Sequence, residues 1–391
     1  PLVAMTILYR KGYGKQSLDA DGRQSETYPE IDPTKYLFDT KIEISLPLDE
    51  TLIHAKIWKS EVFGTSGKMV PVFFLDTLHE KNSPEHQELG MTLYGGDDST
   101  RIRQEYLLGV GGLRALEKLG FKLSGLHLNE GHCTFALLEM LKNGWSREDL
   151  AKRVLFTTHT PVPAGHDRFE WSGVEEVLGE MLPDDAKQLV IEAGDYENGR
   201  RISMSHLGIS LSGSVNAVSK LNAEVASTMF TGKEIVPITN GVHHLTWTTP
   251  AMAKLFDEEL PGWREEPNLL KEAGKLSNSG LATSRNTARQ TLRELVQTST
   301  GVKLDKNRLT IGFARRFATY KRANLVFSDL ERLREIGAGK IQFVFSGKAH
   351  PRDEGGKALI KSIFESAKDL EHDIPVAFLE DYSMATGLAM T

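Results

Sequence analysis

The stretch Ile311–Asp329, IGFARRFATYKRANLVFSD, decides how we interpret the fold. It starts within the apolar run Leu309–Phe313, which has the length of a buried strand. Apolar residues at i, i+4 and i+7 from Val326 then predict a helix that ends at Gly337. Four cations lie between the two elements: Arg315, Arg316, Lys321 and Arg322. The turn between this strand and this helix is therefore strongly basic.

A basic turn at this place predicts an anion site. The positive end of a helix dipole disfavours each cation by roughly 0.3–1 kcal/mol, and a bound anion would offset that cost. The free N–H groups of a first helical turn bind phosphate, and open parallel sheets bind ligands at the carboxyl ends of their strands. We expect a site for phosphate here; a solvated basic turn beside Phe317 and Tyr320 is the alternative.

Size and composition narrow the class of protein. The chain has 391 residues, enough for two or three domains, and is 40% apolar and 26% charged, as globular proteins are. The net charge of −6 gives no general attraction to nucleic acid or membranes, so an anion site must be local. Cys133 is the only cysteine, which excludes an intrachain disulfide. With no signal peptide and no long apolar run, these features indicate a cytoplasmic protein.

Two patterns of secondary structure follow one another along the chain. The runs Lys41–Leu48, Leu52–Trp58 and Met69–Leu75 are separated by short turns, which predicts a meander of antiparallel strands. From Arg101 onward, helical and strand patterns alternate, which predicts a parallel sheet wound on both faces. The fold class is therefore α/β.

The polar, turn-rich segment Thr298–Asn307 is the predicted domain boundary, and we expect it to be exposed. Residues 1–300 would form one doubly wound domain with antiparallel strands near its start. Residues 308–391 begin three strand–helix units but fall short of the about 100–150 residues of such a domain. We expect this second domain to be truncated, and a cleft between the two to collect polar motifs.

The segment HLNEGHC, His127–Cys133, places three polar side chains between a strand end and a helix start: Asn129, Glu130 and His132. Glu130 is well placed to cap backbone N–H groups, and a capping turn with a partly buried histidine is the simplest interpretation. A zinc site shared by His127 and His132 is disfavoured, because the first lies in the strand and the second in the turn.

The segment TTHTPVPAGHDRF, Thr157–Phe169, also follows a predicted buried strand. Its prolines prevent immediate helix formation, so its backbone should be rigid and suited to positioning a substrate beside His159. One alternative is a structural loop whose histidines bond backbone carbonyls. Another is a metal site with His159, His166 and Asp167 as ligands, although the short helical spacing of known zinc signatures is missing.

Three further polar motifs follow predicted strands. In ITNGVHHLTW, Ile238–Trp247, Asn240 could offer its amide to a sugar hydroxyl, although Asn-Gly is also an ordinary turn signal. FSGKAHPRDE, Phe345–Glu354, carries the cation Lys348, and FLEDY ends in Tyr382. Neither a P-loop nor a dinucleotide-binding glycine fingerprint occurs in the chain.

These motifs, in this order, resemble the α-glucan phosphorylases, the family of glycogen and maltodextrin phosphorylases. ARRFATYKR and TTHTPVPAGHDRF are most similar to its shorter bacterial and archaeal branch, and the likeness covers essentially the whole chain. The resemblance implies a GT-B-like fold of two Rossmann-like doubly wound domains around a cleft, with the second one truncated. It also implies a glycosyltransferase that moves glucose from an α-1,4-glucan to inorganic phosphate, giving α-glucose 1-phosphate, with pyridoxal phosphate as cofactor.

On the phosphate side, the resemblance assigns roles to four residues. Arg316 and Lys321 would hold the phosphate groups of the substrate and the cofactor, and Arg315 would line the same pocket. Tyr382 would lie near the cofactor. The preorganised cations would offset charge that builds up on phosphate in the transition state.

On the sugar side, His159 would bond the transferred glucose and Asn240 its distal hydroxyl, while His132 and Asn129 would line the pocket. No residue is implied as a metal ligand. The implied partners are α-glucan and phosphate, with no nucleic acid and no membrane, and assembly into a homo-oligomer is left open.

Two parts of the family pattern are absent from this sequence: a glycine-rich stretch before the first strands, and the stretch that carries the Schiff-base lysine. We therefore expect an internal fragment of a phosphorylase, inactive on its own. Two other functions stay open. A nucleotide-sugar glycosyltransferase of the glycogen synthase type would also need a basic pair for its diphosphate, and a non-catalytic module would only bind glucan.

Overall fold

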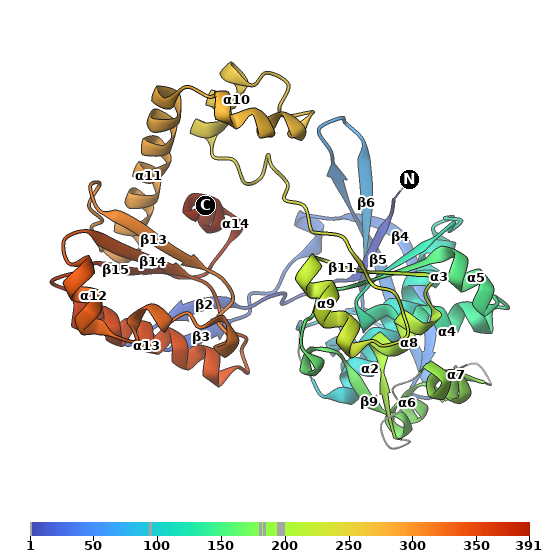
Figure 1. The fold of residues 1–391 in the computed structure, drawn as a ribbon. Helices are drawn as coiled ribbons and strands as arrows, with labels where there is room; N and C mark the ends of the chain where they lie inside the picture. The colour runs from blue at the N-terminus through green and yellow to red at the C-terminus, as the bar shows by residue number, and fades with distance from the viewer. Residues whose placement is uncertain (1, 94–95, 180–181, 183–184, 194–199) are drawn as a thin grey trace. The chain divides into compact units, whose positions relative to one another are not determined.

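The computed structural model describes residues 2–391 except 94–95, 180–181, 183–184 and 194–199. Its contacts divide the chain into two compact units (Figure 1). The first unit comprises Pro1–Tyr13 and Glu30–Gly241, and the second comprises Gly14–Pro29 and Val242–Thr391. Among the described residues, no helix combines the length and the apolar character needed to cross a membrane.

The first unit contains a four-stranded sheet near its start, in the order β1-β6-β5-β4. Its strands are β1 (Ala4–Ile7), β4 (Phe38–Leu48), β5 (Thr51–Phe63) and β6 (Met69–Asp76). β4, β5 and β6 pair antiparallel, which confirms the predicted meander, and β1 adds to β6 in parallel. Leu46 is completely buried between the exposed Ser45 and Pro47, because successive side chains of a strand point to opposite faces.

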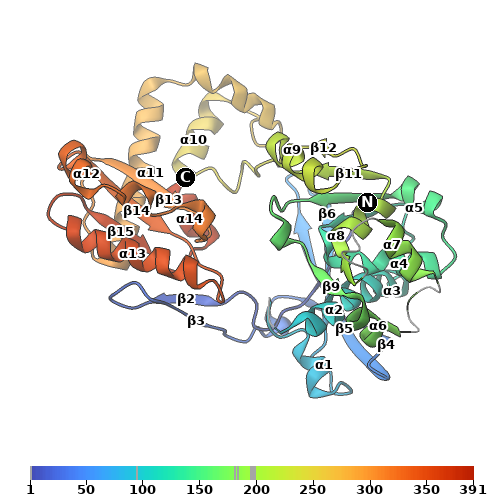
Figure 2. The ribbon, with the colours of Figure 1, turned by 60° about the horizontal axis from the view of Figure 1, so that its bottom comes forward.

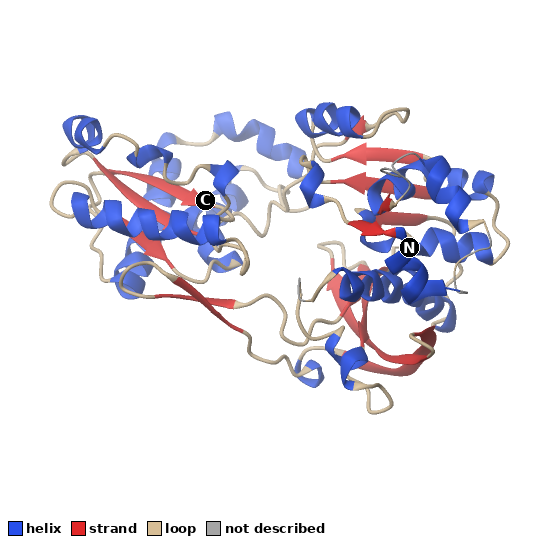
Figure 3. Cartoon of the chain, turned by 90° about the horizontal axis from the view of Figure 1, so that it is seen from below, coloured by secondary structure: helices blue, strands red, loops and turns tan. Residues whose placement is uncertain are grey.

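The second sheet of the first unit is parallel, in the order β12-β11-β8-β7 (Figure 3). Its strands are β7 (Leu126–Asn129), β8 (Val154–Thr158), β11 (Ser214–Ala217) and β12 (Val236–Pro237). Both sheets of this unit pack into one continuous apolar core. The predicted switch from a meander to a parallel, helix-flanked sheet is therefore confirmed.

Helices and one small hairpin complete the first unit. The helices are α1 (Pro84–Glu88), α2 (Asp98–Tyr106), α3 (Gly112–Lys118), α4 (Phe135–Lys142), α5 (Arg147–Arg153), α6 (Trp171–Leu178), α7 (Ala186–Ala193), α8 (Met204–Leu211) and α9 (Lys220–Met229). The antiparallel hairpin joins β9 (Arg168–Glu170) and β10 (Arg201–Ser203). Ser146 caps α5 through a reciprocal capping box with Asp149, as its sequence spacing predicts.

The second unit is built on a parallel sheet in the order β13-β14-β15. Its strands are β13 (Leu309–Ala314), β14 (Ile341–Ser346) and β15 (Val376–Leu379). Its helices are α10 (Pro250–Glu259), α11 (Asn278–Thr300), α12 (Leu330–Gly337), α13 (Glu354–Leu370) and α14 (Met384–Met390). All three strands lie where the sequence predicts them.

A hairpin from the beginning of the chain also belongs to the second unit. It joins β2 (Lys15–Leu18) and β3 (Gln24–Thr27) and runs beside α13 (Figure 2). Gln16 Nε2 donates to Gly347 O at 3.0 Å, and Ala349 N donates to Gln24 Oε1 at 2.9 Å. No feature of the local sequence indicates a partner more than 300 residues away, so sequence reasoning placed this segment with residues 1–300.

The segment Thr298–Asn307 lies inside the second unit, and the compact units meet in sequence at Gly241 rather than between residues 300 and 308. Helix α11 extends through Thr300, and Leu304 is 5% exposed in a cluster with buried residues of α11, β14 and β15. Asp305 N also donates to Gln342 Oε1 at 2.8 Å. Most of Thr298–Asn307 is exposed, as expected, but Leu304 is buried, because its apolar side chain ties the polar segment to the core.

The predicted helix after the basic turn begins later than expected. Helix α12 starts at Leu330 and is capped by Asp329, whose side chain accepts from Arg332 N. Arg322 adopts a left-handed conformation with φ of 52°, and the buried side chains of Ala323 and Phe327 precede the helix. The cations therefore do not face the first turn of α12, and the helix-dipole argument for an anion site is wrong.

Candidate functional site

The carboxyl ends of the first unit's parallel strands bring three predicted sugar-binding residues to one edge. Asn129 ends β7, His159 follows β8, and Asn240 follows β12. The parallel register aligns these ends, because Asn129 pairs with Thr157 of β8 and β11 links β8 to β12. All three side chains are exposed, so they are accessible to a ligand. We call Asn129, His159 and Asn240 the polar edge.

Glu130 lies directly behind the polar edge and is 7% exposed. Its backbone has φ of 63°, in the left-handed region that non-glycine residues seldom adopt. Its Oε1 accepts hydrogen bonds from the backbone N–H groups of His159 and Thr160, the latter at 2.9 Å. The prediction that Glu130 caps the following helical turn is therefore wrong, because its side chain makes no capping hydrogen bond there and instead binds N–H groups of the loop after β8.

The loop from His159 to Asp167 is fixed at its far end as well. His166 is buried, and its imidazole contacts Ser205 Oγ at 2.9 Å through Nδ1 and Thr160 O at 3.1 Å through Nε2. This agrees with the structural interpretation of His166, whose ring bonds a backbone carbonyl. His166 and His159 therefore serve different purposes: the first closes the loop, and the second leaves its side chain exposed.

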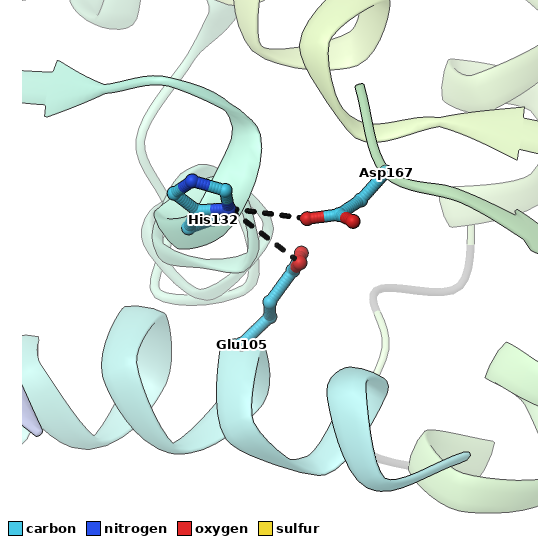
Figure 4. Close-up of side chains that lie close together, drawn as sticks. All are labelled: Glu105, His132 and Asp167. Carbon is cyan, nitrogen blue, oxygen red and sulfur yellow. Dashed lines mark hydrogen bonds and ion pairs between the residues drawn. The ribbon is translucent and has the colours of Figure 1, made fainter. Parts of the chain in front are cut away.

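His132 does not join the polar edge through any contact of its own; it lies in a partly buried ionic cluster with Arg101, Glu105 and Asp167. Its Nδ1 is 3.1 Å from Asp167 Oδ2 and 3.9 Å from Glu105 Oε1, and both carboxylates point toward its ring (Figure 4). The hydrogen bond to Asp167 and the neighbouring Glu105 raise the pKa of His132 to about 9. The imidazole is therefore positively charged at neutral pH.

The pKa values of the two carboxyl groups in this cluster are shifted in opposite directions. Burial raises the pKa of Glu105 to about 8, since its side chain is 1% exposed. Burial also acts on Asp167, but hydrogen bonds from His132 and Glu105 and the charge of Arg101 hold its pKa well below the usual value. Glu105 is therefore mostly protonated at neutral pH, while Asp167 stays ionised between two cations.

Glu105, His132 and Asp167 have the residue types of a metal site, with ligand atoms within 4.8 Å of one another. However, Arg101 Nη2 lies 3.2 Å from Glu105 Oε1, 3.2 Å from His132 Nδ1 and 2.9 Å from Asp167 Oδ2. A guanidinium group thus takes the central position that a metal ion would need. The cluster resembles an internal ion network more than a metal centre.

The second unit gathers cations at the carboxyl ends of its strands. Ala314, Ser346 and Leu379 align in the register of β13, β14 and β15. The residues that follow them are therefore neighbours at one edge: Arg315 and Arg316, Lys348, and Glu380, Asp381 and Tyr382. We call this set, with Lys321, the basic edge.

Within the basic edge, Arg315 and Arg316 are exposed and Lys321 is half-buried. Lys321 Nζ lies 4.6 Å above the centre of the Tyr320 ring, a cation–π contact that orients the ammonium group. Lys348 Nζ is 2.5 Å from Asp381 Oδ1 and donates to Gly14 O at 3.1 Å. The edge therefore holds four cations and two carboxylates, those of Glu380 and Asp381, so positive charge is in excess and the arrangement is suited to an anion.

Comparison with known proteins identifies the family. The family model for carbohydrate phosphorylases matches residues 167–390. Maltodextrin phosphorylase of Thermococcus litoralis is 35% identical over 100% of this chain, which covers 51% of that protein. The chain belongs to the carbohydrate phosphorylase family.

Two further phosphorylase relatives agree with this assignment. Glycogen phosphorylases of Mycobacterium tuberculosis and Aquifex aeolicus are 34% and 32% identical over 98% of this chain. The chain covers 51% and 62% of their lengths. It therefore spans between half and two thirds of the length of these curated relatives.

The phosphorylase motifs are thus distributed over two units. The first unit carries Asn129, His159 and Asn240 on one edge, with His132 in the cluster beside them; the second carries Arg315, Arg316, Lys321 and Tyr382. Sequence reasoning missed Arg101 and Glu105. Their i, i+4 spacing on the otherwise apolar face of RIRQEY was the available signal, because a buried helix face seldom carries two charges without partners.

Proposed function

We propose that this chain carries the glucan-binding and phosphate-binding residues of an α-glucan phosphorylase. The observation that supports this most is that one unit carries the polar edge and the other carries the basic edge. Each lies at the carboxyl ends of parallel strands, where such sheets bind ligands. The printed names of the relatives, maltodextrin and glycogen phosphorylase, agree with a neutral glucan as one substrate and phosphate as the other.

On the polar edge, His159 and Asn240 would bond the hydroxyl groups of the transferred glucose, and Asn129 would line the pocket. Neutral donors and acceptors suit a sugar, which has many hydroxyl groups and no charge. The backbone of His159 is fixed through Glu130, so its imidazole would be held ready for the sugar. His132 would support this pocket indirectly, through its charged cluster with Asp167.

On the basic edge, Arg316 and Lys321 would hold the substrate phosphate, and Arg315 would add a third cation. Guanidinium groups bind phosphate oxygens in pairs, whereas an ammonium group acts as a point charge. Cations fixed in place would stabilise negative charge on phosphate as the glycosidic bond breaks.

The family resemblance implies pyridoxal phosphate as cofactor, and the residues of the basic edge bear on whether this chain could hold it. The basic edge fits the phosphate end of this cofactor, and Tyr382 lies beside Asp381 on the same edge. In phosphorolysis the cofactor would supply a second phosphate group next to the substrate phosphate. Lys321 and Arg316 would then hold two anions that repel each other.

The proposal is tested by ligand binding and by turnover on the same preparation. Titration of the 391-residue chain with maltoheptaose should shift backbone amide signals around His159 and Asn240, and orthophosphate should shift those around Arg316 and Lys321. Formation of glucose 1-phosphate is then assayed with maltodextrin, phosphate and pyridoxal phosphate. Binding of a nucleotide sugar at Arg316, with no response to orthophosphate, would instead support a nucleotide-sugar glycosyltransferase. Maltoheptaose binding alone would support a glucan-binding module.

A further inference from the structure

Glu130 contacts the loop that carries His159 at its first two residues. Oε1 of this one carboxylate accepts from the N–H groups of His159 and Thr160, and Thr158 Oγ1 lies 3.4 Å from the same oxygen. We propose that Glu130 is a positioning residue that fixes the His159 imidazole on the polar edge. This inference rests on the proposed function, because it assumes that His159 binds sugar.

The charge of Glu130 is balanced by the loop itself. In the part of the chain that the structure describes, no lysine or arginine forms an ion pair with Glu130, and the nearest basic group is His166, whose Nδ1 is 3.7 Å from Oε2. A buried carboxylate without a strong cationic partner depends on hydrogen-bond donors to satisfy its oxygens. The two loop N–H groups therefore stabilise Glu130 as much as Glu130 fixes the loop.

The backbone of His159 is held by hydrogen bonds, whereas its side chain is left exposed. Its N–H is bound by Glu130, and its carbonyl oxygen accepts from Asn222 Nδ2 at 3.3 Å. The imidazole itself is exposed. Both peptide groups around His159 are thus held by side chains, one from the end of β7 and one from α9. Only the side-chain rotamers of His159 are left free, which lowers the entropy lost on binding.

The backbone of Glu130 supports the same conclusion. A glutamate with φ of 63° is strained by an amount on the order of 1 kcal/mol or more. A glycine would accept this conformation without strain but could not reach the loop. A glutamate in a conformation that favours glycine is explained if its carboxylate is needed to bind the loop.

Two variants test the role. Glu130→Gln keeps the shape and one acceptor oxygen but loses the charge, while Glu130→Ala removes the acceptor. Glu139→Gln is the matched control: Glu139 is 6% exposed on the adjacent α4, but it pairs with Arg114 at 2.8 Å and does not touch the loop. Each protein is examined as the full 391-residue chain by amide NMR, by titration with maltoheptaose and orthophosphate, and by thermal unfolding.

We expect the His159 and Thr160 amide protons of the wild type to resonate far downfield, as carboxylate-bound amides do. Glu130→Gln should move them upfield and weaken maltoheptaose binding by roughly tenfold, the loss of one charge-assisted contact. Glu130→Ala should weaken maltoheptaose binding further. Glu139→Gln should leave both the amide shifts and the maltoheptaose affinity unchanged. Orthophosphate binding should be the same in all four proteins.

Some outcomes would overturn the inference. If Glu130→Gln unfolds earlier but keeps the wild-type amide shifts and maltoheptaose affinity, Glu130 only stabilises the fold. If His159→Ala abolishes maltoheptaose binding while Glu130→Gln does not weaken it, the positioning role fails and the proposed function stands. If the wild type does not bind maltoheptaose, the proposed sugar site fails, and the amide shifts still decide whether Glu130 holds the loop.

Discussion

The polar edge and the basic edge are built on the same plan but carry opposite chemistry. Each gathers residues that follow neighbouring parallel strands, since the carboxyl ends of such strands meet at one side of the sheet. In the first unit, the buried charge of Glu130 is turned inward to hold a loop, and the edge itself exposes neutral groups such as Asn129 and Asn240. In the second unit, the charges of Arg315 and Arg316 are exposed. Topology therefore fixes where a site lies, and side-chain charge decides what it binds.

The two edges also differ in what holds them in place. The polar edge is supported from within its own unit of sequence, by Glu130 after β7 and Asn222 on the helix that follows β11. The basic edge is supported by the hairpin β2–β3, because Gln16 Nε2 bonds Gly347 O and Gln16 N bonds Asp381 Oδ1 at 3.1 Å. The basic edge thus depends on a segment from the beginning of the chain.

The largest effect is expected where the basic edge is most crowded. Gly347 has φ of 142°, and a Cβ added there would lie 2.0 Å from Arg315 O. Gly347→Ala must therefore push β13 and β14 apart, and we expect it to destabilise the second unit by on the order of 3 kcal/mol. Urea denaturation followed by a probe in this unit measures the loss.

Gly339→Ala is the control for that substitution. Gly339 also has a positive φ, 73°, but a Cβ there meets nothing within 4 Å. Backbone strain alone should cost about 1 kcal/mol. Equal losses in the two variants would show that the close approach of Gly347 to Arg315 does not hold the basic edge together.

The free energy of unfolding should depend on pH differently in the two units above neutral pH. In the first unit, the raised pKa values of His132, about 9, and of Glu105, about 8, mean that the folded state keeps protons that the unfolded state has already released. The contribution of Glu105 should therefore be lost between about pH 4.5 and pH 8, and that of His132 between about pH 6.5 and pH 9. Over the range from about 6.5 to about 9, the loss of stability should be on the order of 2 kcal/mol. In the second unit, burial lowers the pKa of His350, while the burial of Asp381 is outweighed by its hydrogen bond to Lys348, which lowers its pKa. The effects of these two groups lie below this pH range.

Glu105→Gln tests the source of this loss. Glutamine resembles the protonated acid, so the variant should be close to the wild type near pH ~5 and should lose less stability toward pH ~9. Hydrogen exchange of α2 and β14 amides, measured across this range, follows the two units separately. Parallel pH curves for the variant and the wild type would mean that Glu105 is already ionised in the folded state.

Loss of one cation from the basic edge should have a smaller effect. Lys321→Ala removes an ammonium group that Tyr320 orients, and we expect orthophosphate to bind roughly tenfold more weakly. Lys340→Ala removes the same charge at the opposite, amino end of β14 and should leave the affinity within about twofold. Titration followed by phosphorus NMR compares them, and similar losses in both variants would point to general charge attraction instead of a site.

The sequence predicted the three strands of the second unit's parallel sheet, the strands β7, β8 and β12 of the first unit's parallel sheet, and the motifs at their ends, because hydrophobic runs and turn residues are local signals. It did not predict β11 (Ser214–Ala217), which lies between β8 and β12. It could not predict which distant segments meet. The hairpin β2–β3 carries no mark of its contact with Gly347, and the carboxylate of Glu130 gives no sign that it faces the next strand's loop. The helix after the basic turn was misplaced because its apolar spacing was counted from Val326, whereas the buried Phe327 anchors the turn before α12.

The smallest expected effect tests whether the carboxylate of Asp381 lowers the affinity of the basic edge for phosphate. Asp381 has φ of 52°, a conformation that asparagine also accepts, so in Asp381→Asn the amide oxygen could still receive the bond from Gln16 N. Only the negative charge beside Lys348 is lost, so orthophosphate should bind about two- to threefold more tightly, the scale of a partly exposed ion pair.

Asp373→Asn is the matched control, since Asp373 pairs with Arg334 at 3.2 Å just before β15, at the other end of the sheet. The gain at Asp381 should shrink in high salt, because screening weakens attraction between exposed charges. Weaker phosphate binding in Asp381→Asn would show that Lys348 needs its carboxylate to stay in place, and that the edge is organised by this pair more than by its net charge.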